Sequence, residues 1–256
     1  MPAPVNRFKS ALARGETLYG CWAGFADAYA TEILATARFD WLVLDGEHAP
    51  NDLRSIMAQL QVLQGQHSQP VVRLPMGEAW AIKQALDAGA QTLLIPMVES
   101  AEQARDLVRA MRYPPQGIRG SGAALARASR FSGIPDYVTT ANDQMCLVVQ
   151  IESCAALDAL DDICAVDGVD AAFIGPSDLA MDMGLQGDSR HADVQAAMKD
   201  AMSRITASGK APGILATDHD SALRYRDWGA RMLGVGIDVT LFAHASRDLM
   251  ARYRDG

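Results

Sequence analysis

Cysteine is scarce in this chain, and long hydrophobic runs are missing from it. The 256 residues include four cysteines, none in a C-x-x-C pair or beside a histidine cluster, which excludes a zinc ribbon and a secreted disulfide framework. No apolar stretch approaches the ~18 residues of a membrane span. The first seventeen residues are charged and lack the apolar segment of a signal peptide. We therefore expect a cytoplasmic protein without a membrane partner.

The balance of charge is acidic. Lysine and arginine total 23 against 31 aspartates and glutamates, a formal net charge of −8 at pH 7. An acidic surface repels phosphate backbones, which argues against nucleic acid as a partner, but a pocket for a small anion remains compatible with it. Hydrophobic residues make up 49% of the chain. We expect a single domain over residues 1–256, with two small domains as the alternative.

Short apolar runs alternate with helical patterns along the chain. The runs are continuous, which is typical of parallel strands buried on both faces. They cover residues 17–25, 41–44, 70–74, 92–97, 145–151, 169–174, 211–215 and 232–237. Apolar residues at helical spacing lie between them, at residues 52–64, 79–88, from Ser100 onward, 192–208 and 221–228. This order predicts an α/β fold of the (β/α)8 TIM-barrel type, with a doubly wound sheet as the alternative.

Polar residues at the C-terminal ends of barrel strands are the natural candidates for a site, because barrel enzymes carry their active sites there. They are Asp45, Glu47, His48, Arg73, Gln150, Glu152, Ser177, Asp178, Asp218 and His219. Gln150 and Glu152 lie two residues apart on one strand, so both point to the same side. If Val148 faces the barrel axis, these two side chains face it as well.

Glu152 and Asp178 are oxygen donors that follow adjacent strands. Two carboxylates with waters and a chelating substrate suit an octahedral hard cation such as Mg²⁺ or Mn²⁺ better than tetrahedral zinc. Two solvated loop carboxylates are the alternative interpretation.

His48 is a candidate general base, since histidine has the ordinary pKa closest to neutral pH and Asp45 could hold its imidazole in the useful tautomer. A solvent-facing loop histidine is the alternative. Arg73 ends a strand directly before Leu74 and Pro75. An arginine in that position needs an anion, which is either a substrate enolate or carboxylate, or a structural ion-pair partner.

Lysine placement argues against Schiff-base chemistry. The chain has four lysines, Lys9, Lys83, Lys199 and Lys210. Lys9 is near the N-terminus, two others lie on predicted helices, and Lys210 precedes a strand, at the end of the barrel opposite the site. A Schiff base requires a desolvated lysine inside the barrel. Carbanion chemistry in this chain would therefore depend on a metal.

Several motifs in fixed order resemble the HpcH/HpaI aldolase family, in particular its class II pyruvate aldolases such as 4-hydroxy-2-oxoheptanedioate aldolase. The match runs from about residue 19 to residue 238. The motifs are Leu44-Asp45-Gly46-Glu47-His48, Arg73-Leu74-Pro75, Ile95-Pro96-Met97-Val98, Tyr113-Pro114-Pro115-Gln116-Gly117-Ile118-Arg119-Gly120, Gln150-Ile151-Glu152 and Phe173-Ile174-Gly175-Pro176-Ser177-Asp178-Leu179.

The resemblance implies roles for individual residues. Glu152 and Asp178 would bind a divalent metal, which would be Mg²⁺, Mn²⁺ or Co²⁺. Gln150 would hydrogen-bond the substrate, and the backbone around Ser177 and Asp178 would hold the pyruvate carboxylate. Many family members have alanine or asparagine where this chain has Ser177, which could alter the donor preference.

The remaining implied roles are catalytic. His48 would be the acid/base residue, with Asp45 beside it, and Arg73 would stabilise the enolate. Asp87 matches a family aspartate that reaches in from a neighbouring subunit and raises the basicity of the histidine. The resemblance also implies a homohexamer built as a dimer of trimers.

The activity expected from the resemblance is reversible aldol cleavage of 4-hydroxy-2-oxo acids, with pyruvate or a close 2-oxo acid as donor and an aldehyde as acceptor. Two alternatives stay open. One is a metal-dependent acyl-CoA lyase of the citrate lyase β-subunit type. The other is a non-catalytic protein that binds 2-oxo acids.

Overall fold

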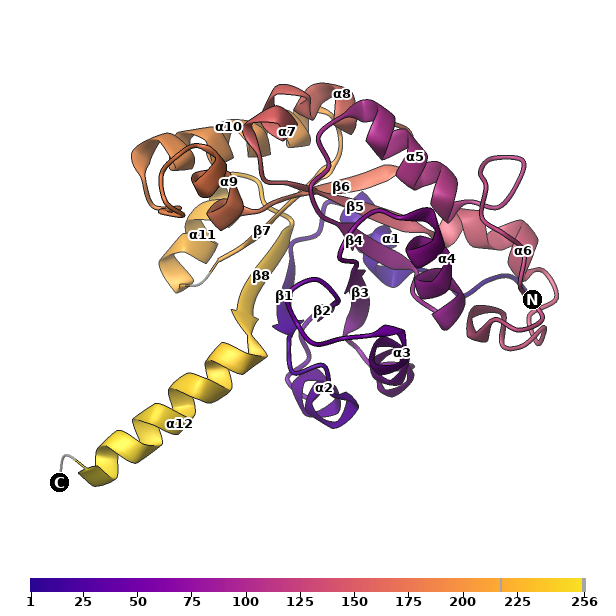
Figure 1. Cartoon of the computed structure of the whole chain (residues 1–256), viewed down its shortest axis with the longest axis horizontal. Helices are drawn as coiled ribbons and strands as arrows, with labels where there is room; N and C mark the ends of the chain where they lie inside the picture. The colour runs from indigo at the N-terminus through magenta and orange to yellow at the C-terminus, as the bar shows by residue number, and fades with distance from the viewer. Residues whose placement is uncertain (217, 255–256) are drawn as a thin grey trace.

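The computed structural model describes residues 1–216 and 218–254, and its centre is a closed barrel of parallel strands in chain order (Figure 1). The strands are β1 (Leu18–Ala23), β2 (Trp41–Asp45), β3 (Gln69–Arg73), β4 (Thr92–Ile95), β5 (Cys146–Ile151), β6 (Val169–Ile174), β7 (Ala211–Leu215) and β8 (Met232–Ile237). Because β8 pairs with both β7 and β1, the doubly wound alternative is wrong. The predicted (β/α)8 barrel is confirmed.

Helices connect the strands and surround the barrel (Figure 1). They are α1 (Arg7–Ala13), α2 (Ala28–Ala35), α3 (Leu53–Val62), α4 (Ala79–Ala88), α5 (Ala101–Met111), α6 (Tyr137–Thr140), α7 (Cys154–Asp158), α8 (Leu160–Cys164), α9 (Pro176–Asp182), α10 (Ala192–Ala207), α11 (His219–Asp227) and α12 (Asp238–Arg254), with the 3-10 helices η1 (Arg127–Ser129) and η2 (Ala141–Gln144). Of the helices described, none has the length and apolar character to cross a membrane.

Polar side chains cap the starts of several of these helices. Asp52 is the N-cap of α3: its side chain accepts the backbone N–H of Ser55, and the Ser55 hydroxyl accepts the backbone N–H of Asp52. Ser100 caps α5 by accepting the backbone N–H of Gln103 at 3.1 Å. At the other end of α4, Gly89 has a φ of 113°, the left-handed conformation that favours glycine after a helix.

Large apolar side chains fill the interior of the barrel. Trp22 packs against Trp41, with ring centroids 5.8 Å apart, and against Phe173 at 5.5 Å. Val148 belongs to the same buried cluster. Because side chains on a strand alternate, Gln150 points toward the axis as predicted, so the polar end of β5 stands above an apolar floor.

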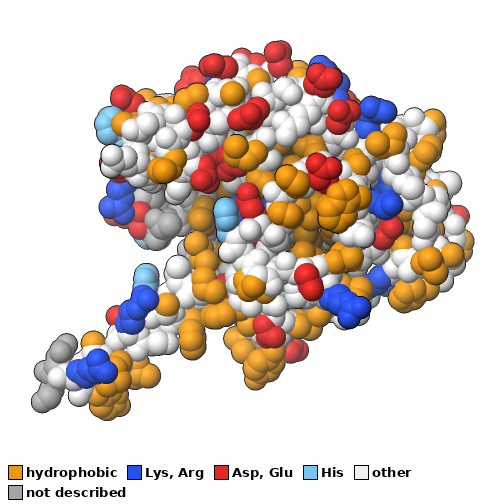
Figure 2. All heavy atoms as spheres, in the orientation of Figure 1, with side chains coloured by type: hydrophobic (Ala, Val, Ile, Leu, Met, Phe, Trp, Pro, Cys, Tyr) orange, Lys and Arg blue, Asp and Glu red, His pale blue; other side chains and the backbone are white. Residues whose placement is uncertain are grey.

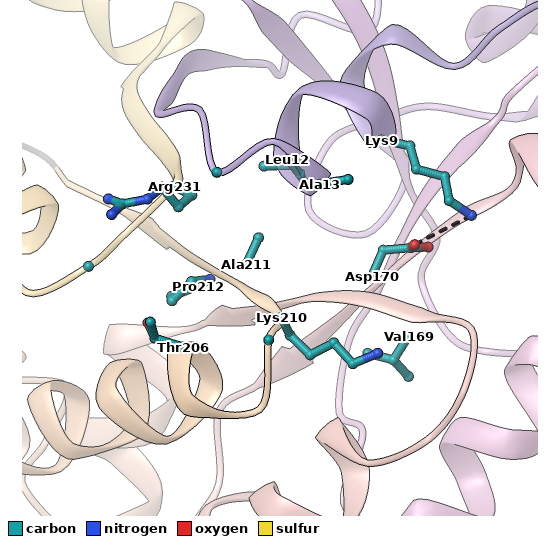
Figure 3. Close-up of a pocket in the computed structure, with 13 residues that line it drawn as sticks. Lys9, Leu12, Ala13, Val169, Asp170, Thr206, Lys210, Ala211, Pro212 and Arg231 are labelled. Carbon is teal, nitrogen blue, oxygen red and sulfur yellow. Dashed lines mark ion pairs between the residues drawn. The ribbon is translucent and has the colours of Figure 1, made fainter.

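The N-terminal strand ends carry a cavity of ≈ 320 Å³ beside α1 (Figure 3). Lys9 pairs there with Asp170 at 3.4 Å. Lys210 lies at this end of the barrel, as predicted, and its side chain points away from that of Arg231 (Figure 3). The cationic groups do not converge on one point, so we assign this cavity no ligand.

Candidate active site

A buried ion pair joins the ends of two neighbouring strands. Asp45 ends β2 and Arg73 ends β3, and the two residues are register partners in the sheet. Nε and Nη2 of Arg73 donate to the two carboxylate oxygens of Asp45 at 2.8 and 2.7 Å, and both residues are buried. Burial alone would raise the pKa of Asp45, but the hydrogen bonds and charge of Arg73 lower it below its ordinary value.

Asp45 also shapes the loop that follows β2. Its Oδ1 accepts the backbone N–H groups of Glu47 at 3.0 Å and His48 at 3.4 Å. Gly46 is required here, because a Cβ at this position would lie 2.7 Å from the backbone oxygen of Arg73. Asp45 therefore holds Arg73 and the loop backbone. Among the contacts of the described residues, Asp45 has none with the imidazole ring of His48, so its predicted role in orienting that ring stays a prediction.

Glu47 is the carboxylate that faces the imidazole, a role that its sequence pattern alone did not indicate. Its Oε2 lies 2.8 Å from Nη1 of Arg73 and 3.8 Å from Nε2 of His48. The Arg73 contact is an ion pair without hydrogen-bond geometry, so this buried oxygen has no hydrogen-bond donor. Burial raises the pKa of Glu47, and the charges of Asp45 and Asp178 add to the rise against the attraction of Arg73. Its place between two candidate residues in one motif was the available signal.

Glu152 and Gln150 stand together at the end of β5, and both are buried. Oε1 of Glu152 accepts the backbone N–H of Met97 at 2.8 Å, and Oε2 accepts a hydrogen bond from the Gln150 side chain. Burial raises the pKa of Glu152, and the nearby charges of Asp178 and Glu47 repel it further. Oε1 of Gln150 is buried without a hydrogen-bond partner, so it can accept a donor from a ligand.

Asp178 enters the site from α9. It lies with Ser177 in the first turn of that helix, where backbone N–H groups have no intrahelical acceptor. Both residues are exposed. Because Asp178 repels both Glu47 and Glu152, the three carboxylates share one acidic region. On the face of the molecule seen in Figure 2, acidic side chains gather around the centre with a histidine beside them.

The described residues contain no group of three histidine, cysteine, aspartate or glutamate side chains arranged to hold a metal ion. Glu152 and Asp178 thus stay two predicted ligands rather than a complete protein cage. The orphaned oxygens of Glu47 and Gln150 and the mutual repulsion of the carboxylates fit a site that takes up a cation with waters or a chelating substrate.

Three other candidates lie apart from this cluster. Asp87 is near the end of α4, which runs from the C-terminal strand ends back toward the opposite end of the barrel. It pairs with Arg119 at 2.8 Å and is not brought to His48 of its own chain. Asp218 caps α11 by accepting the backbone N–H of Ser221, and His219 begins that helix.

Comparison with known proteins supports the sequence motifs. A family model described as HpcH/HpaI aldolase/citrate lyase matches residues 18–245. The chain is 71% identical to a hydroxypyruvate/pyruvate aldolase of Roseovarius nubinhibens, over 99% of both chains. It is 52% identical to a 4-hydroxy-2-oxo-heptane-1,7-dioate aldolase of Escherichia coli, over 97% of this chain and 95% of the relative.

A solved structure of an HpcH/HpaI aldolase/citrate lyase family protein from Burkholderia cenocepacia has the same fold. It superposes with a TM-score of 0.94 at 41% identity, covering 98% of this chain and 100% of that one. The chain described here therefore belongs to the HpcH/HpaI aldolase/citrate lyase family.

Proposed function

We propose that this aldolase reversibly cleaves and forms 4-hydroxy-2-oxo acids, with pyruvate or a close 2-oxo acid as donor and an aldehyde as acceptor. Hydroxypyruvate is the close 2-oxo acid that several relatives' names point to. The observation that carries the proposal is the meeting of Arg73, His48 and a group of carboxylates at the C-terminal strand ends. These are the groups needed to take a proton from a carbon next to a keto group and to stabilise the resulting enolate.

Glu152 and Asp178 would hold a divalent metal, either Mg²⁺, Mn²⁺ or Co²⁺. Oxygen-only donors from adjacent strand ends support a hard cation, and the raised pKa of Glu152 marks a carboxylate that gains from a positive neighbour. When bound, such a cation supplies Lewis-acid polarisation of the 2-oxo acid.

The other residues of the site transfer the proton and bind the substrate. Nε2 of His48 takes and returns the proton, and Glu47 stabilises the imidazolium that forms. Asp45 accepts from Nε and Nη2 of Arg73, and Glu47 lies 2.8 Å from Nη1 without hydrogen bonding to it, so the guanidinium is fixed at the strand ends and Nη1 keeps its donors for the enolate oxygen. Gln150 binds the substrate, and the N–H groups of Ser177 and the residue after it hold the substrate carboxylate.

The enzyme acts as a homo-oligomer, a hexamer arranged as a dimer of trimers, in which Asp87 serves the site of a neighbouring copy. Helix α12 supports an association of copies. It extends away from the barrel (Figure 1), and only its first residue is buried. Hydrophobic side chains along it are open to solvent, as Figure 2 also shows, namely Leu241, Phe242, Leu249, Met250 and Tyr253. An apolar stripe of this kind gains stability when a second copy covers it.

The test is deuterium uptake into the methyl group of pyruvate, followed by NMR. Uptake should stop after exhaustive chelation and return with Mg²⁺, Mn²⁺ or Co²⁺, and His48→Ala should lose uptake while still binding the cation. His67→Ala is the matched control, because His67 pairs with Asp40 before β2. Full uptake without metal would end the metal assignment, and normal uptake in His48→Ala would end the base assignment.

The same preparation separates the two alternative functions. Cleavage of malyl-CoA in preference to 4-hydroxy-2-oxo acids would identify an acyl-CoA lyase. Binding of pyruvate without any deuterium uptake would identify a non-catalytic 2-oxo acid binding protein. Either result would overturn the proposal.

A further inference from the structure

Arg119 is a fully buried cation outside the cluster at the strand ends. Its side chain has no exposed surface, although it belongs to the irregular connection between α5 and η1. Burying a guanidinium removes it from water, and the partner interactions in the interior rarely return more than that desolvation costs. A buried arginine in a loop therefore calls for an explanation other than stability.

Two tyrosines and the loop backbone hold the guanidinium in one place. Its central carbon lies 4.4 Å from the ring centroid of Tyr113 and 5.9 Å from that of Tyr137, and the two rings meet edge to face at 6.5 Å. The backbone N–H of Arg119 donates to the Arg112 oxygen at 2.9 Å. Gly117 permits this close approach, since a Cβ there would lie 2.2 Å from the same oxygen.

The guanidinium delivers one strong hydrogen bond, to Asp87. Nη2 of Arg119 donates to Oδ1 of Asp87 at 2.8 Å. The Asp87 side chain is 27% exposed, and within the described part of the chain its Oδ2 has no hydrogen-bond donor. Asp87 is thus a partly exposed carboxylate whose Oδ1 is held by the buried Arg119 and whose Oδ2 is available to a donor, at the end of the barrel away from its own His48.

We propose that Arg119 is a positioning residue for the aldol reaction: it fixes Asp87 so that Oδ2 faces the imidazole of His48 in a second copy of the chain. The inference rests on the proposed function, which places Asp87 in a neighbouring site. It adds that this carboxylate works only when the buried Arg119, clamped by Tyr113 and Tyr137, holds its inner oxygen. A rigid carboxylate keeps the imidazole oriented, whereas a free one would sample several rotamers.

The first test compares Arg119→Met and Arg119→Lys with Asp87→Asn in pyruvate deuterium exchange across pH. We expect a loss of about 10²-fold in kcat for Arg119→Met, as for a misplaced catalytic group, with partial rescue in Arg119→Lys. Arg204→Met is the matched control, because Arg204 of α10 pairs at the surface with Asp161 of α8 and Asp200 of α10, away from the site.

The pH dependence of kcat/KM distinguishes a positioning role of Arg119 from a merely structural one. Loss of a carboxylate beside an imidazole lowers the apparent pKa of that base, so Asp87→Asn and Arg119→Met should shift the acid limb of kcat/KM in the same direction, and the double variant should add nothing. Glu47, which faces His48 within its own chain, is unchanged in every variant. A rise of the apparent pKa in Arg119→Met, or additive effects, would overturn the proposal.

The second test asks whether Arg119 serves a neighbour. His48→Ala and Arg119→Met proteins are mixed, dissociated and reassembled, and the exchange rate is measured. If Arg119 of one copy serves His48 of another, random reassembly gives some sites an intact His48 from one variant and an intact Arg119 from the other. About a quarter of the sites have both, so about a quarter of the wild-type activity returns. No recovery in mixed oligomers verified by mass spectrometry would refute the role. If Arg119→Met does not fold, Arg119→Lys replaces it. An inactive wild type would instead contradict the proposed function.

Discussion

Replacing Gly175 with alanine is a stringent test of the site geometry. Gly175 precedes α9, and a Cβ at this position would lie 2.6 Å from Oε2 of Glu152, 2.9 Å from its Cβ and 3.2 Å from Nε2 of Gln150. The terminal oxygen can swing away, but the Cβ is fixed to the backbone of the residue after β5. The methyl group must therefore push the whole Glu152 side chain, or α9 itself, by a few tenths of an ångström or more.

The size of the effect follows from overpacking and misplacement. Extra methyl groups in packed regions cost about 1–3 kcal/mol, and each kcal/mol lowers Tm by roughly 2–4 °C in a protein of this size. The loss of activity should be the larger effect, because a displacement of about 1 Å at a positioned group can reduce the rate by about 10²-fold. Cation affinity should fall as well, since Glu152 is a proposed ligand.

The assay combines thermal unfolding, calorimetric titration with Mn²⁺ and pyruvate deuterium exchange. Gly209→Ala is the matched control. Gly209 has a φ of 78° and open space around its Cβ position, so alanine there costs about 1–2 kcal/mol in backbone strain at the opposite end of the barrel. We expect similar losses of Tm in both variants, with activity lost only in Gly175→Ala. Equal activity in the two variants would refute the reasoning.

Three further predictions follow from the same contacts. Asp45→Asn breaks the buried pair with Arg73 and should reduce the free energy of unfolding, measured in urea at pH 7, by about 3–5 kcal/mol. Because the folded-state pKa of Asp45 is lowered, the stability difference between wild type and variant should disappear as the pH falls below about 3.8. A difference that stays constant with pH would contradict this prediction. Glu47→Gln should raise Tm at pH 7 in protein treated with a chelator, and it should lower the rate of deuterium exchange. A carboxyl group whose pKa is raised in the folded state destabilises that state once the pH exceeds the ordinary pKa of the group. An unchanged Tm at both pH 4 and pH 7 would count against this prediction. Phe242→Glu, on the exposed side of α12, should shift light-scattering mass toward smaller species, and an unaltered mass would exclude this face from the interface.

The fold could be predicted because buried parallel strands produce continuous apolar runs, but two strand ends could not. The predicted strand over 92–97 stops at Ile95, because Met97 adopts a φ of 54° and its N–H donates to Glu152 instead of a neighbouring strand. The strand over 17–25 stops at Ala23, because the N–H of Gly24 donates to Asp238. In both places a carboxylate far away in sequence ends the ladder, and apolar patterning does not record such a partner.

Strand-end reasoning also led to the candidate site, because closing a barrel brings every C-terminal strand end to one rim. The sequence could not show which of these side chains contact one another at that rim. Asp45 and Glu47 follow the same strand, and only the register of β2 with β3 puts the first on Nε and Nη2 of Arg73 and the second on Nη1. The role of Arg119 could not be predicted for a different reason: in sequence it is one residue of a glycine-rich loop, and its guanidinium packs on Tyr113 before that loop and on Tyr137, the first residue of α6.

The charges of the site explain why a motif alone does not amount to a working centre. Asp45, Glu47, Glu152 and Asp178 carry four potential negative charges, and Arg73 is the guanidinium among them, bound mainly to Asp45. A 2-oxo acid brings another negative charge, so the acidic region by itself opposes its own substrate. A cation bound among these carboxylates would offset their repulsion of the 2-oxo acid. By thermodynamic linkage, the cation and the 2-oxo acid would then each strengthen the binding of the other. If Glu152 and Asp178 bind a cation as proposed, the carboxylates that repel an anion on its own would favour an anion that binds together with the metal.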